Sequence, residues 1–389
     1  MKAITTMQRT AAPDQREKAS VLVAGASFAG LATAYWMNRL GYHVTVVEVG
    51  KGLKRGGTPV DIREGTVEII KRMGLFERTW ARKLQTRSMS FKNGHGVTIV
   101  ETPAQPAEEQ SASGDYEIDR DVLLDIMFDA VKDDVEFLFG DSIAALDETA
   151  DAVAVTFNGG SHRSYSLLFG CDGNHSSVRR LHFGPESEYA FFLQNYFAVE
   201  VVPGLLIESN TSLIYNVPGR AVMINSYKDK TDVVVTFFSE DEIPYNYRDQ
   251  AEQRQILTSH FAKENAVLRD WLAKMGNSND FYFDKFCQIR MPSWTRGRVA
   301  LVGDAGYCAS PAAGMGGSLA IVGAAALADA FTKHPGDVAI AFREYSESLR
   351  PFVEQVQADA IDFGLDMFAP RTEEAIQNRN ANLTGNSPS

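Results

Sequence analysis

The sequence predicts an α/β protein in which a parallel-sheet domain is interleaved with an antiparallel-sheet domain and a long helix closes the ordered chain. Two apolar runs, at 21–24 and 44–47, flank a helical pattern, which predicts a parallel strand pair. Residues 187–290 alternate between apolar and polar positions, as half-buried antiparallel strands do. From residue 298 an apolar strand, a glycine-rich loop and helical patterns follow, the last of them over 337–368.

Helices are expected where apolar residues recur at helical spacing and a stop signal follows. The first two patterns end at Gly41 and Gly74, as helices with a glycine at the C-terminal end do. The expected helices before the last one are 29–40, 66–73, 119–131, 249–262 and 266–275, and several short strands are expected within 135–170.

The order of these patterns sets the expected domain boundaries. The segments are a flexible leader at 1–18, a discontinuous parallel-sheet domain at 19–186 and 291–335, an antiparallel-sheet substrate domain at 187–290 that part of 80–115 joins, a C-terminal helix at 336–368 and a flexible tail at 369–389. The leader lacks the apolar centre of a signal peptide, and no segment has the apolar length of a transmembrane helix.

Composition limits the function classes. The 389-residue chain has 44% hydrophobic and 23% charged residues and a net charge of −12. This acidic balance argues against nucleic acid as the main partner and against stable association with anionic membranes. The three cysteines, Cys171, Cys287 and Cys308, are widely spaced and no histidine pair has metal-ligand spacing, so we expect no disulfide framework and no metal. We therefore expect a cytoplasmic monomer or weak homodimer that acts on a small molecule.

The first motif that carries chemistry is the segment Gly-Ala-Ser-Phe-Ala-Gly at 25–30, between the first strand and the first helix. Dinucleotide binding requires a tight turn at Gly25, close approach of the backbone to a pyrophosphate at Ser27 and tight helix–strand contact at Gly30. The helix N-terminus offers N–H groups to phosphates, and Glu48 stands where a carboxylate binds ribose hydroxyls. The alternative is a glycine-containing turn that holds no ligand.

Two further motifs follow. Residues 169–179 lead from an apolar strand end through the turn Asp172-Gly173 into a helix start, which alone is an ordinary turn. In the third motif, 297–317, an apolar strand ends on Asp304 and a glycine-rich loop precedes a helix. Asp304 could accept a hydrogen bond from a ribityl hydroxyl, and the helix N–H groups could hold the pyrimidine oxygen of a flavin. The alternative is a strand-to-loop turn with an aspartate cap.

The three motifs, in this order and spacing, resemble the group A flavoprotein monooxygenases, to which para-hydroxybenzoate hydroxylase belongs, over about residues 19–368. The resemblance implies a Rossmann-type FAD-binding domain of the GR2 type. It also implies that Asp304 holds the ribityl chain, that Asp172 lies between FAD and the nicotinamide path, and that Arg120 contacts FAD. The implied FAD-binding residues are Gly25, Ser27, Phe28, Ala29, Gly30, Glu48, Val49, Asp61, Arg120, Asp172, Gly173, Gly303, Asp304, Pro311, Gly314, Met315, Gly316 and Gly317.

A narrower resemblance is to the tetracycline-inactivating flavin monooxygenases. It rests on the segments 56–63, 72–75, 303–308, 318–320 and 349–354, and it implies that Asp61 contacts FAD. The chain departs from the wider family, which often has Gln, Asp and His at the positions of Met315, Gly323 and Tyr307. The sheet residues 190–240 match no substrate motif of the family.

Several side chains keep two interpretations. Arg55 and Arg63 are candidates for binding the NADPH phosphate or are solvated loop charges. Tyr196, Tyr215 and Phe237, with the neighbouring Phe197, line the substrate face or are ordinary core aromatic residues. His162 and His175 are expected to be exposed loop residues. No constellation of catalytic residues is found, so we name no catalytic base or nucleophile.

The implied cofactors define a hypothesis for the reaction. NADPH or NADH reduces FAD, dioxygen then gives a flavin 4a-hydroperoxide, and one oxygen atom passes to an enol or phenol carbon. A tetracycline-like polycyclic substrate is favoured, which predicts tetracycline degradation and antibiotic resistance. The alternatives are hydroxylation of another phenol or polyketide, and an FAD-dependent reductase or oxidase without oxygen insertion. A flavin-dependent halogenase is disfavoured, because its WxWxIP signature is absent around Trp271 and Trp294.

Overall fold

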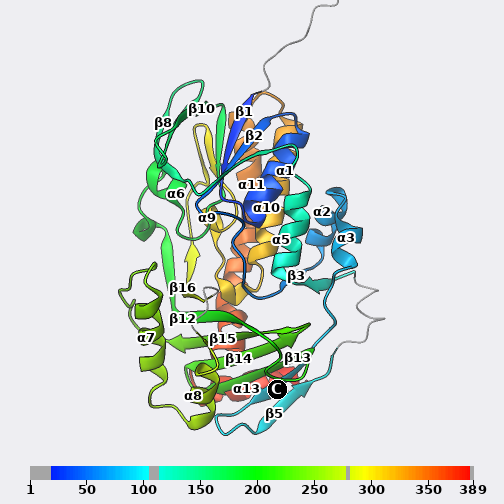
Figure 1. Ribbon diagram of the computed structural model, residues 1–389, viewed down its shortest axis with the longest axis vertical. Coiled ribbons are helices and arrows are strands. Elements are labelled where there is room, and N and C mark those ends of the chain that lie inside the picture. The colour runs from blue at the N-terminus through cyan, green and yellow to red at the C-terminus, as the bar shows by residue number, and fades with distance from the viewer. Residues whose placement is uncertain (1–18, 105–113, 277–280, 386–389) are drawn as a thin grey trace, which may run out of the picture.

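The computed structural model describes residues 19–104, 114–276 and 281–385. Figure 1 shows two halves stacked along the long axis, a parallel sheet with its helices above and a second sheet below, joined by the long helix α11. The predicted leader at 1–18 and residues 105–113, in the segment expected to join the substrate domain, lie outside the described residues.

A six-stranded sheet forms the centre of the upper half, in the order β17-β18-β11-β1-β2-β7. Every neighbouring pair is parallel except β17 with β18. The apolar run Val21–Val23 of β1 is completely buried, because helix α1 and the three-stranded sheet β10-β9-β8 both contact this strand. Bounds of the strands are β1 Ser20–Ala24, β2 His43–Glu48, β7 Glu136–Phe139, β8 Ile143–Glu148, β9 Val153–Phe157, β10 His162–Tyr165, β11 Leu167–Gly170, β17 Thr295–Arg296 and β18 Val299–Leu301.

Helices and one small sheet complete the upper half. Helix α1 packs against α10, and a two-stranded antiparallel sheet of β3 and β6 lies beside them. Their bounds are α1 Phe28–Arg39, β3 Val60–Ile62, α2 Gly65–Arg72, α3 Phe76–Trp80, β6 Tyr116–Ile118, α5 Arg120–Asp129, α6 Ser177–His182, the 3-10 turn Glu186–Glu188, α9 Asp304–Tyr307, the 3-10 turn η2 Pro311–Ala313, α10 Gly316–Lys333 and α11 Val338–Asp359.

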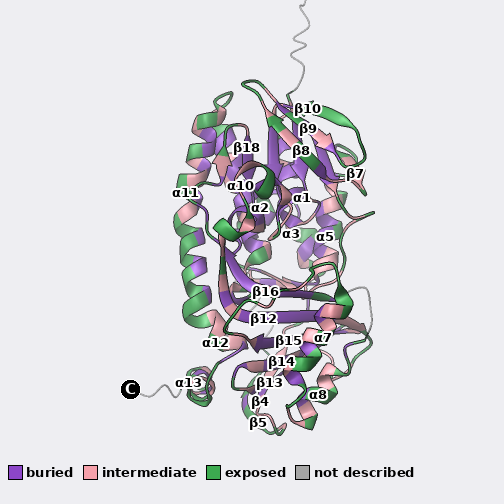
Figure 2. Ribbon diagram, turned by 90° about the vertical axis from the view of Figure 1, so that its left-hand side faces the viewer, coloured by how far each residue is buried: buried purple, intermediate pink, exposed green. Residues whose placement is uncertain are grey.

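A seven-stranded sheet forms the lower half, in the order β16-β12-β15-β14-β13-β4-β5. Its neighbours are antiparallel except β13 with β4, and its last two strands come from the chain before residue 103. Figure 2 shows α7 and α8 against one face of this sheet and the C-terminal segments against the other. Bounds are β4 Ser88–Lys92, β5 Thr98–Thr102, β12 Ala190–Pro203, β13 Thr211–Val217, β14 Arg220–Tyr227, β15 Lys230–Phe238, α7 Gln250–Phe261, α8 Ala266–Leu272 and β16 Tyr282–Ile289.

The C-terminal chain corrects one expectation. The tail predicted to be flexible at 369–389 forms helix α13 (Glu373–Leu383), which follows a π-helical turn, Ala360–Gly364, and the short helix α12 (Leu365–Phe368). Arg379 of α13 is only 6% exposed: its guanidinium donates to Asn216 Oδ1 at 2.7 Å and lies over the Phe91 ring. The polar composition concealed this packing, because a paired arginine can be buried. No helix among the described residues has the length and apolar character to cross a membrane.

Candidate active site

The glycine turn after β1 has the backbone geometry that a diphosphate site needs. Gly25 has φ +103°, and a Cβ there would lie 2.5 Å from the Cys171 carbonyl oxygen. A Cβ on Gly30 would collide with the Gly25 carbonyl oxygen, so helix α1 packs directly on the turn. Ser27, the N-cap of α1, makes no side-chain capping bond, which leaves the first N–H groups of the helix, those of Phe28 and Ala29 among them, able to bind an anion.

Glu48 is fixed beside this turn at the end of β2. Its carboxylate accepts hydrogen bonds from the Ala26 N–H at 2.9 Å and the Gly50 N–H at 2.8 Å. The parallel pairing of β1 with β2 sets Ala24 opposite Val47, so the strand ends bring the carboxylate to the phosphate turn. A carboxylate has about four acceptor positions, so Glu48 can still bind ribose hydroxyls. The adjacent Val49 is 73% exposed.

Arg120 closes the same region from helix α5. Its Nη1 donates to the carbonyl oxygens of Lys54 and Gly56, both at 3.0 Å, and its guanidinium lies 5.4 Å from the Phe28 ring centre. Burial lowers the pKa of Arg120. Gly57 leaves room for this side chain, since a Cβ there would lie 2.9 Å from Arg120 Cδ. Arg120 therefore joins the 49–59 loop to the first motif.

In the second motif, the side chain of Asp172 mainly stabilises the start of the helix that follows, α6. The Asp172 carboxylate accepts from the backbone N–H groups of Ser177 and Val178, at 2.7 and 3.1 Å, and caps α6. Gly173 makes the turn with φ +80°. The fully buried Arg179 then donates to the Ala305 carbonyl oxygen at 2.8 Å. This bond fixes the second motif to the third, a role for Arg179 that no pattern in the sequence indicates.

The third motif places a carboxylate and a glycine-rich loop against the first motif. Asp304 begins α9 after Gly303 and is partly accessible, yet burial raises its pKa to about 6. A Cβ on Gly303 would lie 3.0 Å from the Ala29 side chain, so the two motifs pack together. A desolvated carboxylate with spare acceptor positions suits a ligand that brings hydroxyl groups.

The loop at 311–317 ends at an open helix N-terminus. The N-cap of α10, Met315, makes no side-chain capping bond, and Gly314 has φ +64°. A Cβ on Gly317 would lie 2.7 Å from the Val60 side chain and 3.6 Å from the Phe28 ring. Pro311 begins the 3-10 turn η2, and Gly316 begins α10. First motif, third motif and strand β3 thus converge at one place.

Asp61 lies on β3 at this convergence. Its carbonyl oxygen accepts from Ser318 Oγ at 3.1 Å, and its carboxylate pairs with Arg63 at 2.7 Å. Arg55 instead pairs with Asp125 of α5 at 2.6 Å. The side chains of Arg55 and Arg63 are 46% and 63% exposed, so both candidates for NADPH binding are accessible from solvent.

The three aromatic candidates for substrate contact share one face of the lower sheet, and this face is covered. Tyr196 and Phe237 are completely buried, Tyr215 is 7% exposed, and all three pack in one cluster with residues of α7 and α8. The structure therefore supports the core interpretation for these residues. Their neighbour Phe197 points to the other face, where Val199, Val234 and Phe286 form a cluster with Ala312 of η2 and Ala360.

His175 joins the second motif to the lower sheet. It is partly exposed, as expected, but its ring contacts Glu186 at 2.9 Å and the buried Asp284 of β16 at 3.1 Å. These hydrogen bonds, that to Asp284 first, raise the pKa of His175 to about 9. Asp284 also accepts from the hydroxyl groups of Tyr245 and Tyr282. No sequence signal pointed to Asp284, because its partners are distant in the chain.

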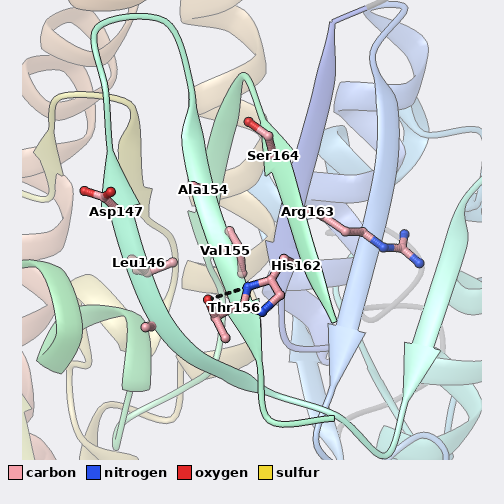
Figure 3. A pocket seen from close by; sticks show the side chains of 9 residues that line it. Leu146, Asp147, Ala154, Val155, Thr156, His162, Arg163 and Ser164 are labelled. Carbon is pink, nitrogen blue, oxygen red and sulfur yellow. Dashed lines mark hydrogen bonds between the residues drawn. The ribbon is translucent and has the colours of Figure 1, made fainter. Parts of the chain in front are cut away.

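A separate depression lies away from these motifs. It has a volume of about 470 Å³ and lies over the three-stranded sheet, where Figure 3 shows His162 bonded to Thr156 beside Leu146. It contains none of the candidate cofactor residues. Among the described residues no cluster of three metal-ligating side chains is present.

This geometry fits FAD, since the glycine backbones, Glu48, Asp304 and two uncapped helix N-termini are the groups that a dinucleotide flavin needs. The fold and site thus define a flavoprotein. A family model described as an FAD binding domain matches residues 18–360. The chain therefore belongs to this FAD-binding family and is a group A FAD-dependent monooxygenase, which confirms the predicted fold class and family.

Three similar proteins show the extent of the match. An uncharacterised protein of Mycobacterium tuberculosis is 37% identical over 87% of this chain and 91% of its own. A flavin-dependent monooxygenase of Legionella longbeachae is 33% identical over 87% of this chain and 86% of its own. The crystal structure of the tetracycline destructase Tet(51) is 32% identical, with a TM-score of 0.83 and coverage of 95% and 96%.

Proposed function

We propose that the chain uses NADPH or NADH and dioxygen to add one oxygen atom to an electron-rich enol or phenol carbon, and that tetracycline is the first substrate to test. The observation that carries the proposal is the convergence of the glycine turn, Asp304 and strand β3 opposite an apolar sheet face. The similarity to the tetracycline destructase Tet(51) supports the choice of substrate.

Each group of the site has a distinct task in this proposal. The N–H groups at the start of α1 bind the diphosphate of FAD, Glu48 binds the ribose, and Asp304 accepts from the ribityl chain. The N–H groups at the N-terminus of α10 would bind the pyrimidine oxygens of FAD. When bound, FAD supplies electron transfer from the nicotinamide and the activation of dioxygen.

In this proposal the face of the seven-stranded sheet that lies beside η2 forms the walls of the substrate site. Phe197, Val199 and Val234 carry no charge, so they exclude water without competing for the polar atoms of a substrate. Arg55 and Arg63 are proposed to bind the phosphates of the nicotinamide donor, because both guanidinium groups are accessible. Their ion pairs with Asp125 and Asp61 must loosen when the donor binds.

The test measures NADPH and oxygen consumption by the purified, FAD-loaded protein with and without tetracycline, together with the product mass and hydrogen peroxide. Stimulated consumption with a gain of one oxygen atom supports the proposal. Consumption with stoichiometric peroxide and no oxygenated product indicates an oxidase. If tetracycline gives no stimulation while other phenols or polyketides do, the monooxygenase proposal stands and tetracycline is excluded.

A further inference from the structure

Two carboxylates face each other on the antiparallel pair of β3 and β6, beside the proposed FAD site. Strands β3 and β6 pair so that Asp61 stands opposite Glu117, and their side chains are 38% and 21% exposed. Side chains opposite each other on an antiparallel pair lie on the same face, where like charges destabilise the sheet. Burial raises the pKa of both carboxyls. The pair therefore needs either cations or a shared proton.

Two arginines supply the cations, from very different environments. Arg63 pairs with Asp61 at 2.7 Å and is 63% exposed, so solvent screens its charge. Arg87 bonds through Nη2 to Glu117, and its side chain is only 14% exposed. The Arg87 charge opposes the pKa rise of both carboxyls. Arg63 has the larger effect of the two cations on Asp61, whereas the mostly buried Arg87 has the larger effect on Glu117, to which it is bonded, and also acts on Asp61.

Arg87 also connects this pair to the lower sheet. It directly precedes β4, and its guanidinium lies 5.6 Å from the ring centre of Tyr227 at the end of β14. The Tyr227 hydroxyl donates to both oxygens of the fully buried Asp232, at 2.9 and 3.0 Å. Arg87 thus contacts strands of both halves of the molecule.

Further charged groups lie around the pair, among them Lys228, which lies 3.9 Å from Asp119. Asp115, before β6, adds a negative charge near Asp61. Across the junction, Lys230 of β15 pairs at 2.9 Å with Asp119, the N-cap of α5, next to Arg120. The charge of Arg87 also opposes the rise in the pKa of Asp232. The second guanidinium nitrogen of Arg87, Nη1, is buried without a hydrogen-bond partner among the described residues.

We propose that Arg87 is a positioning residue, which keeps the Asp61–Glu117 pair ionised and ties β3 to the substrate sheet, so that this pair adds no change of charge beside the flavin to that of Asp304. The proposal rests on FAD binding at β3, which the packing of Gly317 on Val60 and the Ser318 bond to Asp61 support. It does not depend on the identity of the substrate. Without Arg87 the pKa values of the two carboxyls rise further, so the pair takes up a proton at higher pH and the flavin environment then changes with pH.

The experiment follows the visible absorbance of the bound flavin between pH 5 and pH 9, without substrate or NADPH, in the holoenzyme and four variants. Arg87→Gln is expected to raise the titration midpoint by about one pH unit or more. Arg87→Lys should restore most of the original profile, because it keeps the charge. Arg63→Gln is the matched control and should shift the midpoint less, because it leaves Glu117 bonded to Arg87.

The double variant Arg87→Gln with Glu117→Gln separates positioning from folding. Removal of the second carboxylate should abolish the new titration, and should restore FAD retention if Arg87→Gln alone loses FAD. A profile of Arg87→Gln that superimposes on the original overturns the proposal. So does a shifted titration, or a loss of FAD, that persists in the double variant. Because these spectra need no substrate, a failure with tetracycline does not affect them.

Discussion

The two halves of the molecule encode their function differently. In the upper half, binding geometry comes from backbone: Gly25 and Gly30 leave no space for a side chain, and helix N-termini provide the N–H groups. In the lower half, it depends on which face of a strand a side chain occupies, as Tyr196 and Phe197 show by pointing in opposite directions. A glycine is visible in the sequence, whereas the face of a strand is not.

The largest expected effect is on the glycine turn. Gly25→Ala places a Cβ 2.5 Å from a carbonyl oxygen at φ +103°, so we expect FAD content to fall at least about tenfold. Gly41→Ala is the control, since φ is +91° there but no atom lies within 4 Å. It should cost only about 1 kcal/mol of stability and leave FAD content unchanged. Equal FAD loss in both variants, measured as flavin per protein, would contradict the role of the close approach.

The second prediction concerns Gly323 and Tyr307 in the upper half, two positions at which the chain is expected to depart from the wider family. A Cβ on Gly323 would collide with the Tyr307 hydroxyl, which bonds the Tyr345 hydroxyl at 3.0 Å. Tyr307 thus fills the space beside Gly323. We expect Gly323→Ala to lower the free energy of unfolding by about 1–3 kcal/mol, and Tyr307→Phe to recover part of this loss in the double variant. Additive losses in denaturant titrations would refute the pairing.

A third prediction tests the two sheet faces. Tyr196→Phe removes an acceptor for the Ile243 N–H at 2.7 Å, so stability should fall by about 1 kcal/mol while KM for the substrate stays constant. Phe197→Leu should change KM several-fold, because Phe197 lies on the face beside Ala312. Steady-state kinetics on an identified substrate decide the matter. A changed KM for Tyr196→Phe with an unchanged KM for Phe197→Leu would reverse the assignment of the faces.

The smallest effect concerns the contact between the halves through His175. Its pKa is raised to about 9, so its stabilising contribution is complete below about pH 6.5 and is lost as pH rises through 9. The thermal midpoint of the native protein should therefore fall more between pH 7 and pH 10 than that of His175→Gln. Because the side chain is 37% exposed, we expect a difference of only a few degrees. Parallel curves would show that the ion pairs contribute nothing.

The sequence was informative where one residue decides the local geometry. The glycine turn, Glu48 and Asp304 stand at strand ends that apolar runs reveal, and the structure brings them together. Tail helix α13 was missed because the contact of Arg379 with Asn216 crosses 163 residues. The Asp61–Glu117 pair was missed for a similar reason, since only the register of β3 with β6 sets these carboxylates opposite each other.

The strand order of the upper sheet also governs when the protein becomes complete during synthesis. Strand β11 pairs with both β1 and β18, and β18 leaves the ribosome only after all seven strands of the lower sheet. Asp304 and the 311–317 loop come later still. A nascent chain can therefore finish its lower sheet while its flavin site lacks one wall, and a chain cut short before residue 300 cannot retain FAD.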